Sequence, residues 1–179
     1  SGFGVGNGPD TTLALAARTA RGEVVGPFIY SSGQLIDGPG SFWGPGVVVE
    51  TVEGVRERVR QDAEAGYIAV KLYANLTPEQ FRAGVEEARA RGLQVYSHVP
   101  ASMTLEEVLD LHVDSIEHLD AYERSLGGEG TGMQSRWVAA PADRFAPLAQ
   151  RVAQSGVWQV PTLIVTLAPG RGFADLNAA

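Results

Sequence analysis

Three polar side chains stand at the ends of short apolar segments, where they could bind a metal ion or transfer a proton. Lys71 lies near the end of YIAVKLY, His98 ends LQVYSH, and His118 ends DSIEH. If these segments are parallel strands, their carboxyl ends meet at one rim, where α/β folds place function. Neutral imidazoles are ligands for zinc and related ions. A buried lysine has a lowered pKa, and its neutral amine can form a Schiff base, act as a base or react with carbon dioxide to give a carbamate that bridges two metals.

Each of these residues, taken alone, also fits a purely structural role. Lys71 can extend its amine into solvent, and His98 and His118 can be strand-end histidines with satisfied hydrogen bonds. His112 follows a short predicted helix, and we interpret it as a helix-terminus histidine and not as a ligand. The metal or proton-transfer hypothesis depends on the equivalent positions of a lysine and two histidines on consecutive strands.

Other sequence patterns for catalysis are weak or missing. The Gly-rich start of the chain has no strand before it, so a dinucleotide-binding turn is not indicated, and the chain has neither a GxxxxGK[ST] nor a GxSxG motif. Ser97 and His98 are adjacent on a predicted strand, so their side chains would face opposite ways and could not form a nucleophile pair. Trp43 lies in a loop rich in Gly and Pro, where it could cover a substrate or pack the loop onto the domain.

The elements that must position these side chains alternate between strand and helix. Apolar periodicity and capping signals predict helices at 51–65, 77–91, 104–111 and 142–155, and strands at 24–30, 67–73, 93–98, 114–118 and 157–163. Gly/Pro-rich composition predicts loops at 1–9, 32–46 and 126–135. Three helices end on Gly just before a strand, at Gly66, Gly92 and Gly156. This alternation predicts a parallel sheet, either an open doubly wound sheet or a (β/α)8 barrel.

Composition excludes several classes of protein. The chain has 179 residues, a formal net charge of −7 and no cysteine. It therefore has no disulfide scaffold, no cysteine-based zinc site and no thiol nucleophile. The acidic balance argues against binding nucleic acid or an anionic membrane, and no apolar stretch is long enough to span a bilayer. Residues 1–10 carry no basic leader pattern, and we favour the cytoplasm over a secreted or periplasmic location.

Several segments together resemble the amidohydrolase superfamily, in its imidazolonepropionase-like and Xaa-Pro dipeptidase (prolidase-like) branch. The order Lys, His and SxEH along the chain is the more specific part of the resemblance. The matching segments are GEVVGPFIYSSGQLIDGPG (22–40), AGYIAVKLYANLTPEQ (65–80), ARARGLQVYSHVP (88–100), VDSIEHLD (113–120) and VPTLIVTL (160–167).

The resemblance implies a (β/α)8 TIM-barrel hydrolase with a metal site at the barrel mouth. By this similarity Lys71 is the carboxylated lysine that bridges two metals, and His98 and His118 are metal ligands. One or two divalent ions, with zinc expected, would activate a hydroxide that attacks an amide, peptide-like or cyclic C–N bond. Tyr73 matches a tyrosine that polarises the substrate carbonyl, and we place Trp43 with Tyr73 at the substrate.

The chain also departs from the family pattern. No His-x-His pair occurs, and Asp175, the only Asp after Asp143, lies too soon after the last strand to be the family's strand-8 aspartate. Barrels of this type usually need about 250 residues. We therefore expect an internal portion of the barrel, about strands 3–7, over residues 1–167, with 168–179 as a loop or tail.

Three interpretations follow from these departures. The first is part of a metal-dependent hydrolase that acts on a small-molecule or dipeptide-like substrate. Another chain or segment would complete its site, and the enzyme would be a homo-oligomer. Neither nucleic acid nor a membrane would be a partner. The second is a non-catalytic or metal-binding module derived from such a barrel. The third is an unrelated flavodoxin-like protein in which the lysine and histidines are placed by chance.

Overall fold

The computed structural model describes residues 9–41, 46–119 and 121–162. The chain divides into two compact units, Ser1–Met103 and Thr104–Ala179, and each unit is described by itself. Within the described ranges, no helix is both long and apolar enough to cross a membrane.

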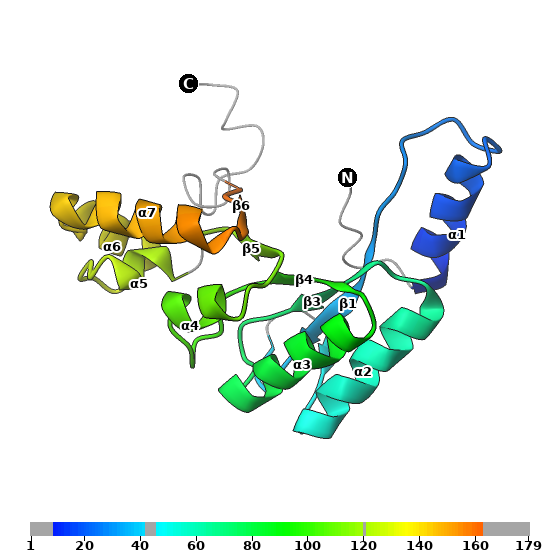
Figure 1. Ribbon diagram of the computed structural model, residues 1–179, viewed down its shortest axis with the longest axis horizontal. Helices are drawn as coiled ribbons and strands as arrows, with labels where there is room; N and C mark the ends of the chain where they lie inside the picture. The colour runs from blue at the N-terminus through cyan, green and yellow to red at the C-terminus, as the bar shows by residue number, and fades with distance from the viewer. Residues whose placement is uncertain (1–8, 42–45, 120, 163–179) are drawn as a thin grey trace. The chain divides into compact units, whose positions relative to one another are not determined.

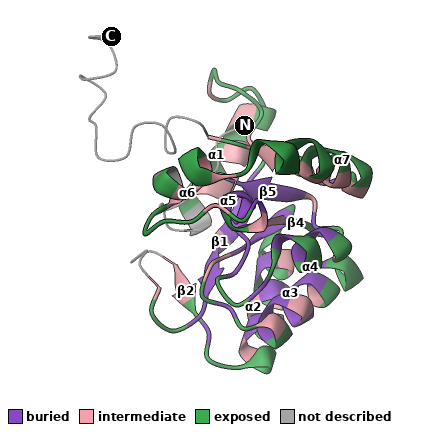
Figure 2. Cartoon of the chain, turned by 90° about the vertical axis from the view of Figure 1, so that its left-hand side faces the viewer, coloured by how far each residue is buried: buried purple, intermediate pink, exposed green. Residues whose placement is uncertain are grey.

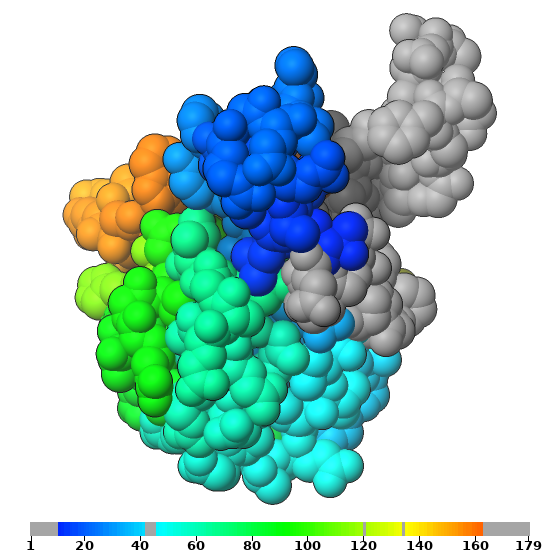
Figure 3. All heavy atoms as spheres, turned by 90° about the vertical axis from the view of Figure 1, so that its right-hand side faces the viewer, coloured from blue at the N-terminus to red at the C-terminus, as the bar shows by residue number. Residues whose placement is uncertain are grey.

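The first unit is built on a four-stranded parallel sheet. The strands lie in the order β2-β1-β3-β4, and every neighbouring pair is parallel. Helices α2 and α3 pack side by side (Figures 1 and 3). In chain order the elements are α1 (Pro9–Ala20), β1 (Ser32–Asp37), β2 (Val47–Val48), α2 (Val52–Ala65), β3 (Ala69–Leu72), α3 (Pro78–Ala90) and β4 (Gln94–Ser97).

Local signals explain where the main helices of this unit begin and end. The Thr77 side chain accepts a hydrogen bond from the Gln80 backbone, and the Gln80 side chain accepts one from the Thr77 backbone, which makes a capping box at the start of α3. Gly66 ends α2 in the left-handed conformation, with φ of 92°. Each helix buries one stripe, which includes Val55 on α2 and Phe81 on α3, while its outer side stays exposed (Figure 2).

The second unit carries two parallel strands and several helices. Strand β5 pairs with β6, with Glu117 opposite Val160. Helix α4 packs against α7, and an ion pair joins Asp110 to Arg151. In chain order the elements are α4 (Leu105–Asp110), β5 (Ser115–Glu117), α5 (Tyr122–Ser125), α6 (Met133–Ala139), the 3-10 helix η1 (Ala142–Arg144), α7 (Phe145–Ser155) and β6 (Trp158–Val160).

Most predicted elements are present with slightly different ends, but the predicted strand at 24–30 is wrong. This segment has no strand, and Val25, Phe28 and Tyr30 are exposed. Pro27 interrupts the segment and cannot donate to a sheet. The first strand is β1, inside the segment 32–46 that composition predicts as a loop. Its Gly33 is a packing residue, because a Cβ there would lie 2.1 Å from the Asp62 carboxylate.

Three helices have no counterpart among the predicted elements. They are α1, α5 and α6, and α6 begins inside the loop predicted at 126–135. Composition identifies the glycines of that loop but not the helical turn that follows them. The predicted alternation of strand and helix nevertheless holds in both units.

Candidate functional site

Lys71, Tyr73 and His98 come together at the carboxyl ends of β3 and β4 in the first unit. Lys71 and His98 are buried, and Tyr73 is half-buried. The rings of Tyr73 and His98 lie 4.0 Å apart between centroids, with their planes at 54°. The backbone continues the sheet pattern here, since the Tyr73 N–H donates to the Ile36 carbonyl at 2.9 Å and the His98 N–H donates to the Leu72 carbonyl at 3.0 Å. The backbone of two adjacent strands therefore holds both side chains in place.

Lys71 faces away from the helical layer. Its neighbour Leu72 faces α3, because a Cβ on Gly84 of that helix would lie 3.1 Å from the Leu72 methyl groups. Successive residues of a strand point to opposite faces, so Lys71 belongs to the other face. The register pairs Lys71 with Leu35 on one side and with Tyr96 on the other, so all three residues share that face. Lys71 is buried on this face, with 8% of its surface exposed.

Asp37, at the end of β1, belongs to this rim and is missed by the sequence analysis. Its carboxylate is fully buried and accepts hydrogen bonds from the backbone N–H groups of Gly38 at 2.9 Å and Asn75 at 2.7 Å, and from the Asn75 side chain at 2.9 Å. Asn75 follows Tyr73 by two residues, so Asp37 joins the loop after β1 to the loop after β3. The one signal in the sequence is an Asp-Gly pair directly after the apolar residues of β1.

His118 ends β5 in the second unit, where several backbone angles are unusual. Its backbone N–H donates to the Val160 carbonyl at 2.7 Å, and its ring Nδ1 lies 2.8 Å from the hydroxyl of Thr162. His118, Leu119, Ala121 and Thr162 all have positive φ, between 42° and 68°. Non-glycine residues rarely adopt this conformation, and such strain is concentrated at functional sites.

The side chains of these residues are of types that can bind a metal ion. Imidazole nitrogens are ligands for zinc, and Lys71 would become an oxygen ligand if it were carboxylated. In the described parts of the chain, no group of three or more His, Cys, Asp or Glu residues could hold a metal ion. Lys71 and His98 belong to one unit and His118 to the other. Trp43, predicted to contact substrate, lies outside the described residues.

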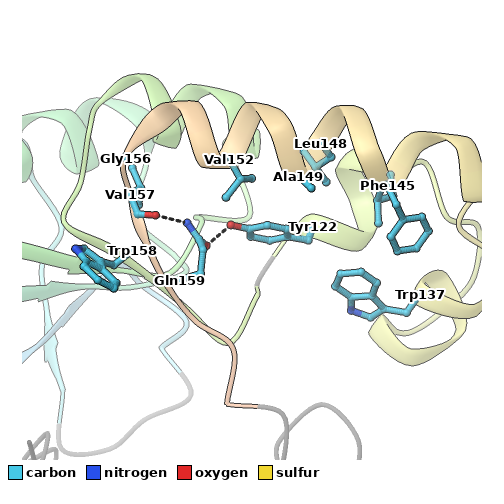
Figure 4. A pocket seen from close by; sticks show the side chains of 12 residues that line it. Tyr122, Trp137, Phe145, Leu148, Ala149, Val152, Gly156, Val157, Trp158 and Gln159 are labelled. Carbon is cyan, nitrogen blue, oxygen red and sulfur yellow. Dashed lines mark hydrogen bonds between the residues drawn. The ribbon is translucent and has the colours of Figure 1, made fainter.

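A cavity of about 510 Å³ in the second unit has a different character. Leu148 and Val152 of α7 line it, together with Trp137 and Phe145, whose rings lie 6.3 Å apart (Figure 4). At its polar end the Tyr122 hydroxyl donates to the Gln159 side-chain oxygen. Burial raises the pKa of Tyr122 above its usual range, so the phenol stays a neutral donor. The cavity suits contact with an apolar group, and its lining includes none of the predicted site residues.

Comparison with known proteins decides the fold. No protein-family model and no curated protein matches the chain. Among solved structures, a bottromycin amidohydrolase has 24% identity and a TM-score of 0.69 over 94% of this chain and 38% of its own. The chain has the amidohydrolase fold. The same fold relates it to a Xaa-Pro dipeptidase solved with bound methionine in the active site, with 20% identity and a TM-score of 0.65 over 94% of this chain and 45% of that one.

A third solved structure, ochratoxinase from A. niger, has 19% identity and a TM-score of 0.58 over 92% of this chain and 44% of its own. The chain thus spans less than half the length of each of these proteins. Both the resemblance to amidohydrolases and the expected internal portion of their barrel are confirmed at the level of the fold. The roles of Lys71, Tyr73, His98 and His118 stay predictions.

Proposed function

We propose that the chain is part of a metal-dependent hydrolase that cleaves an amide, peptide-like or cyclic C–N bond. The observation that carries this proposal is the cluster of Lys71, Tyr73 and His98 at the carboxyl ends of two adjacent parallel strands. In folds of this class, residues at that end of the strands perform the chemistry. The names of two proteins that share the fold, an amidohydrolase and a dipeptidase, support the same bond type.

The proposed roles follow from the chemistry of each side chain. Carboxylated Lys71, His98 and His118 would hold one or two divalent ions, with zinc expected from the ligand types. A bound ion would supply a water of low pKa and a Lewis acid for the substrate carbonyl. The Tyr73 hydroxyl would donate a hydrogen bond to the carbonyl oxygen, and its contact with the His98 ring keeps the phenol beside the strand ends. Trp43 would contact the substrate.

The proposed assembly follows from the missing part of the site. Another chain or segment would supply the remaining ligands, and the enzyme would be a homo-oligomer. Its substrate would be a small molecule or a dipeptide-like compound. The alternative is a metal-binding or non-catalytic module derived from such a barrel.

Hydrolysis of a panel of Xaa-Pro and acyl-amino-acid substrates, with Zn²⁺ and bicarbonate present, tests this proposal. His98→Ala and His118→Asn should each lower kcat/KM by about 100-fold or more, because even the loss of a residue that only orients a metal ligand costs about 10–100-fold. Asn tolerates the left-handed backbone at position 118. His112→Asn is the matched control, since His112 is exposed and should leave activity unchanged. Full activity in His98→Ala would contradict the role of His98 as a ligand, and zinc binding without hydrolysis in the unaltered protein would favour the alternative.

A further inference from the structure

The end of β5 and the chain just after β6 are joined by three linked contacts. The His118 backbone N–H donates to the Val160 carbonyl at 2.7 Å. The Thr162 hydroxyl oxygen lies 3.2 Å from the same carbonyl and 2.8 Å from Nδ1 of the His118 ring. The contacts close a ring that runs from the His118 backbone through Val160 and Thr162 back to the His118 side chain.

The hydrogens available to this circle of contacts favour one protonation of the imidazole. A threonine hydroxyl has one hydrogen to donate, whereas a carbonyl oxygen can only accept. If the Thr162 hydroxyl donates to Val160, it must accept from Nδ1, and every contact in the ring is then a hydrogen bond. If the hydroxyl instead donates to Nδ1, two oxygen acceptors face each other at 3.2 Å with no hydrogen between them. The first arrangement satisfies more of the groups that take part in these three contacts.

We propose that Thr162 is a positioning residue that holds neutral His118 in the tautomer with hydrogen on Nδ1, so that the lone pair of the ring lies on Nε2. The contact also sets the rotation of the imidazole, because it holds Nδ1 beside the Thr162 hydroxyl, just after the end of the neighbouring strand β6. Histidines that bind metals commonly donate their other ring N–H to an oxygen in this way. The relevance of the tautomer to zinc therefore rests on the proposed function, whereas the tautomer itself does not.

The backbone conformation of Thr162 and His118 also supports a positioning role for Thr162. Thr162 is β-branched and has φ of 42°, and His118 has φ of 61°. A β-branched residue in this region is strained, and surrounding contacts must hold it there. The linked contacts among His118, Val160 and Thr162 supply such support at both strained positions. With this backbone conformation the Thr162 hydroxyl lies 2.8 Å from Nδ1 of His118.

Nitrogen-15 NMR of the imidazole rings tests the tautomer directly. The protein is labelled on histidine and measured at a pH about two units above the ordinary histidine pKa of about 6.5, where the rings are neutral. The chain has three histidines, so the His118 signals are assigned by their loss in His118→Asn. We expect Nδ1 of His118 to carry the hydrogen and Nε2 to be unprotonated. A dominant Nε2–H form in the unaltered protein would overturn the proposal, and this result needs no variant.

Two substitutions separate the hydroxyl from the shape of residue 162. Thr162→Val keeps the branched shape and removes the acceptor, so the ratio of the Nδ1–H to the Nε2–H form should fall about tenfold, the loss of one hydrogen bond. Thr162→Ser restores the hydroxyl and should restore the ratio. Unchanged signals from His98 and His112 show that each variant is folded. An unchanged ratio in folded Thr162→Val would contradict the role of Thr162.

Zinc titration of the same proteins distinguishes this inference from the proposed function. If both hold, zinc affinity should fall about 10–100-fold in Thr162→Val and recover in Thr162→Ser. If the unaltered protein shows the Nδ1–H form but binds no zinc at His118, the proposed function fails and the tautomer stands. If zinc binds at His118 in the Nε2–H form through Nδ1, the function stands and the inference fails.

Discussion

Two buried aspartates of the first unit differ in how many hydrogen-bond partners their carboxylates have. The Asp37 carboxylate accepts three hydrogen bonds, two of them from backbone N–H groups. The Asp62 side chain is also buried, but Arg58 contacts only one of its oxygens, at 2.5 Å, and the other has no hydrogen-bond partner among the described residues. Burial raises the pKa of Asp62 to about 6, against the opposing effect of Arg58. Ionised Asp62 therefore opposes folding.

Asp62 should make stability fall as pH rises. Since the folded protein binds this proton more tightly than the unfolded chain, its contribution is complete below about pH 4 and is lost as pH passes about 6. The difference between the ordinary pKa of 3.8 and about 6 corresponds to about 3 kcal/mol. Urea unfolding of the chain and of Asp62→Asn across this range measures it. The free energy of unfolding of the chain minus that of the variant should fall between pH 4 and 6, and a flat or rising difference would refute this assignment.

Residue types predict one part of the candidate site better than another. Lys71 and His98 can be predicted because each stands at the end of a short apolar run, and neighbouring strand ends must meet. Asp37 and Thr162 could not, because their partners Asn75 and His118 lie 38 and 44 residues away in the chain. Only the paired strands show that these side chains reach one another.

At the scale of elements, boundaries encoded by nearby residues can be predicted, while choices between strands cannot. The capping boxes at Thr77 and Thr104 involve residues three apart, so the starts of α3 and α4 are visible in the sequence. The segment 24–30 is more apolar than β1, yet β1 is the strand. Gly33 lets β1 approach Asp62 of α2, and this contact depends on packing that local propensity does not contain.

Asp37 should stabilise the contact between two such elements, the loops that follow β1 and β3. Asp37→Ala leaves the buried Gly38 N–H and the part-buried Asn75 N–H without their acceptor, so the free energy of unfolding should fall by about 2 kcal/mol. The matched control is Asp110→Ala, since the Asp110 side chain is 72% exposed and its ion pair with Arg151 lies on the surface. Urea unfolding at neutral pH compares the two. Similar losses in both variants would show that the Asp37 contacts do not hold these loops together.

At the scale of the whole molecule, the partial match to solved structures and the position of Lys71 point the same way. The chain matches less than half of each of the three solved proteins named above. Lys71 lies on the sheet face away from α2 and α3, which in a closed barrel is the interior. A portion of the barrel fold accounts for both observations.

The central proposal is that Lys71, His98 and His118 are metal ligands. The most direct test is an anomalous-difference map at the zinc absorption edge, from crystals of the protein grown with Zn²⁺ and bicarbonate. We expect a peak at about 2 Å from a ring nitrogen of both His98 and His118, and from an oxygen of carboxylated Lys71. A peak bound by other residues, or a map with no peak while these three side chains lie apart, would contradict the claim.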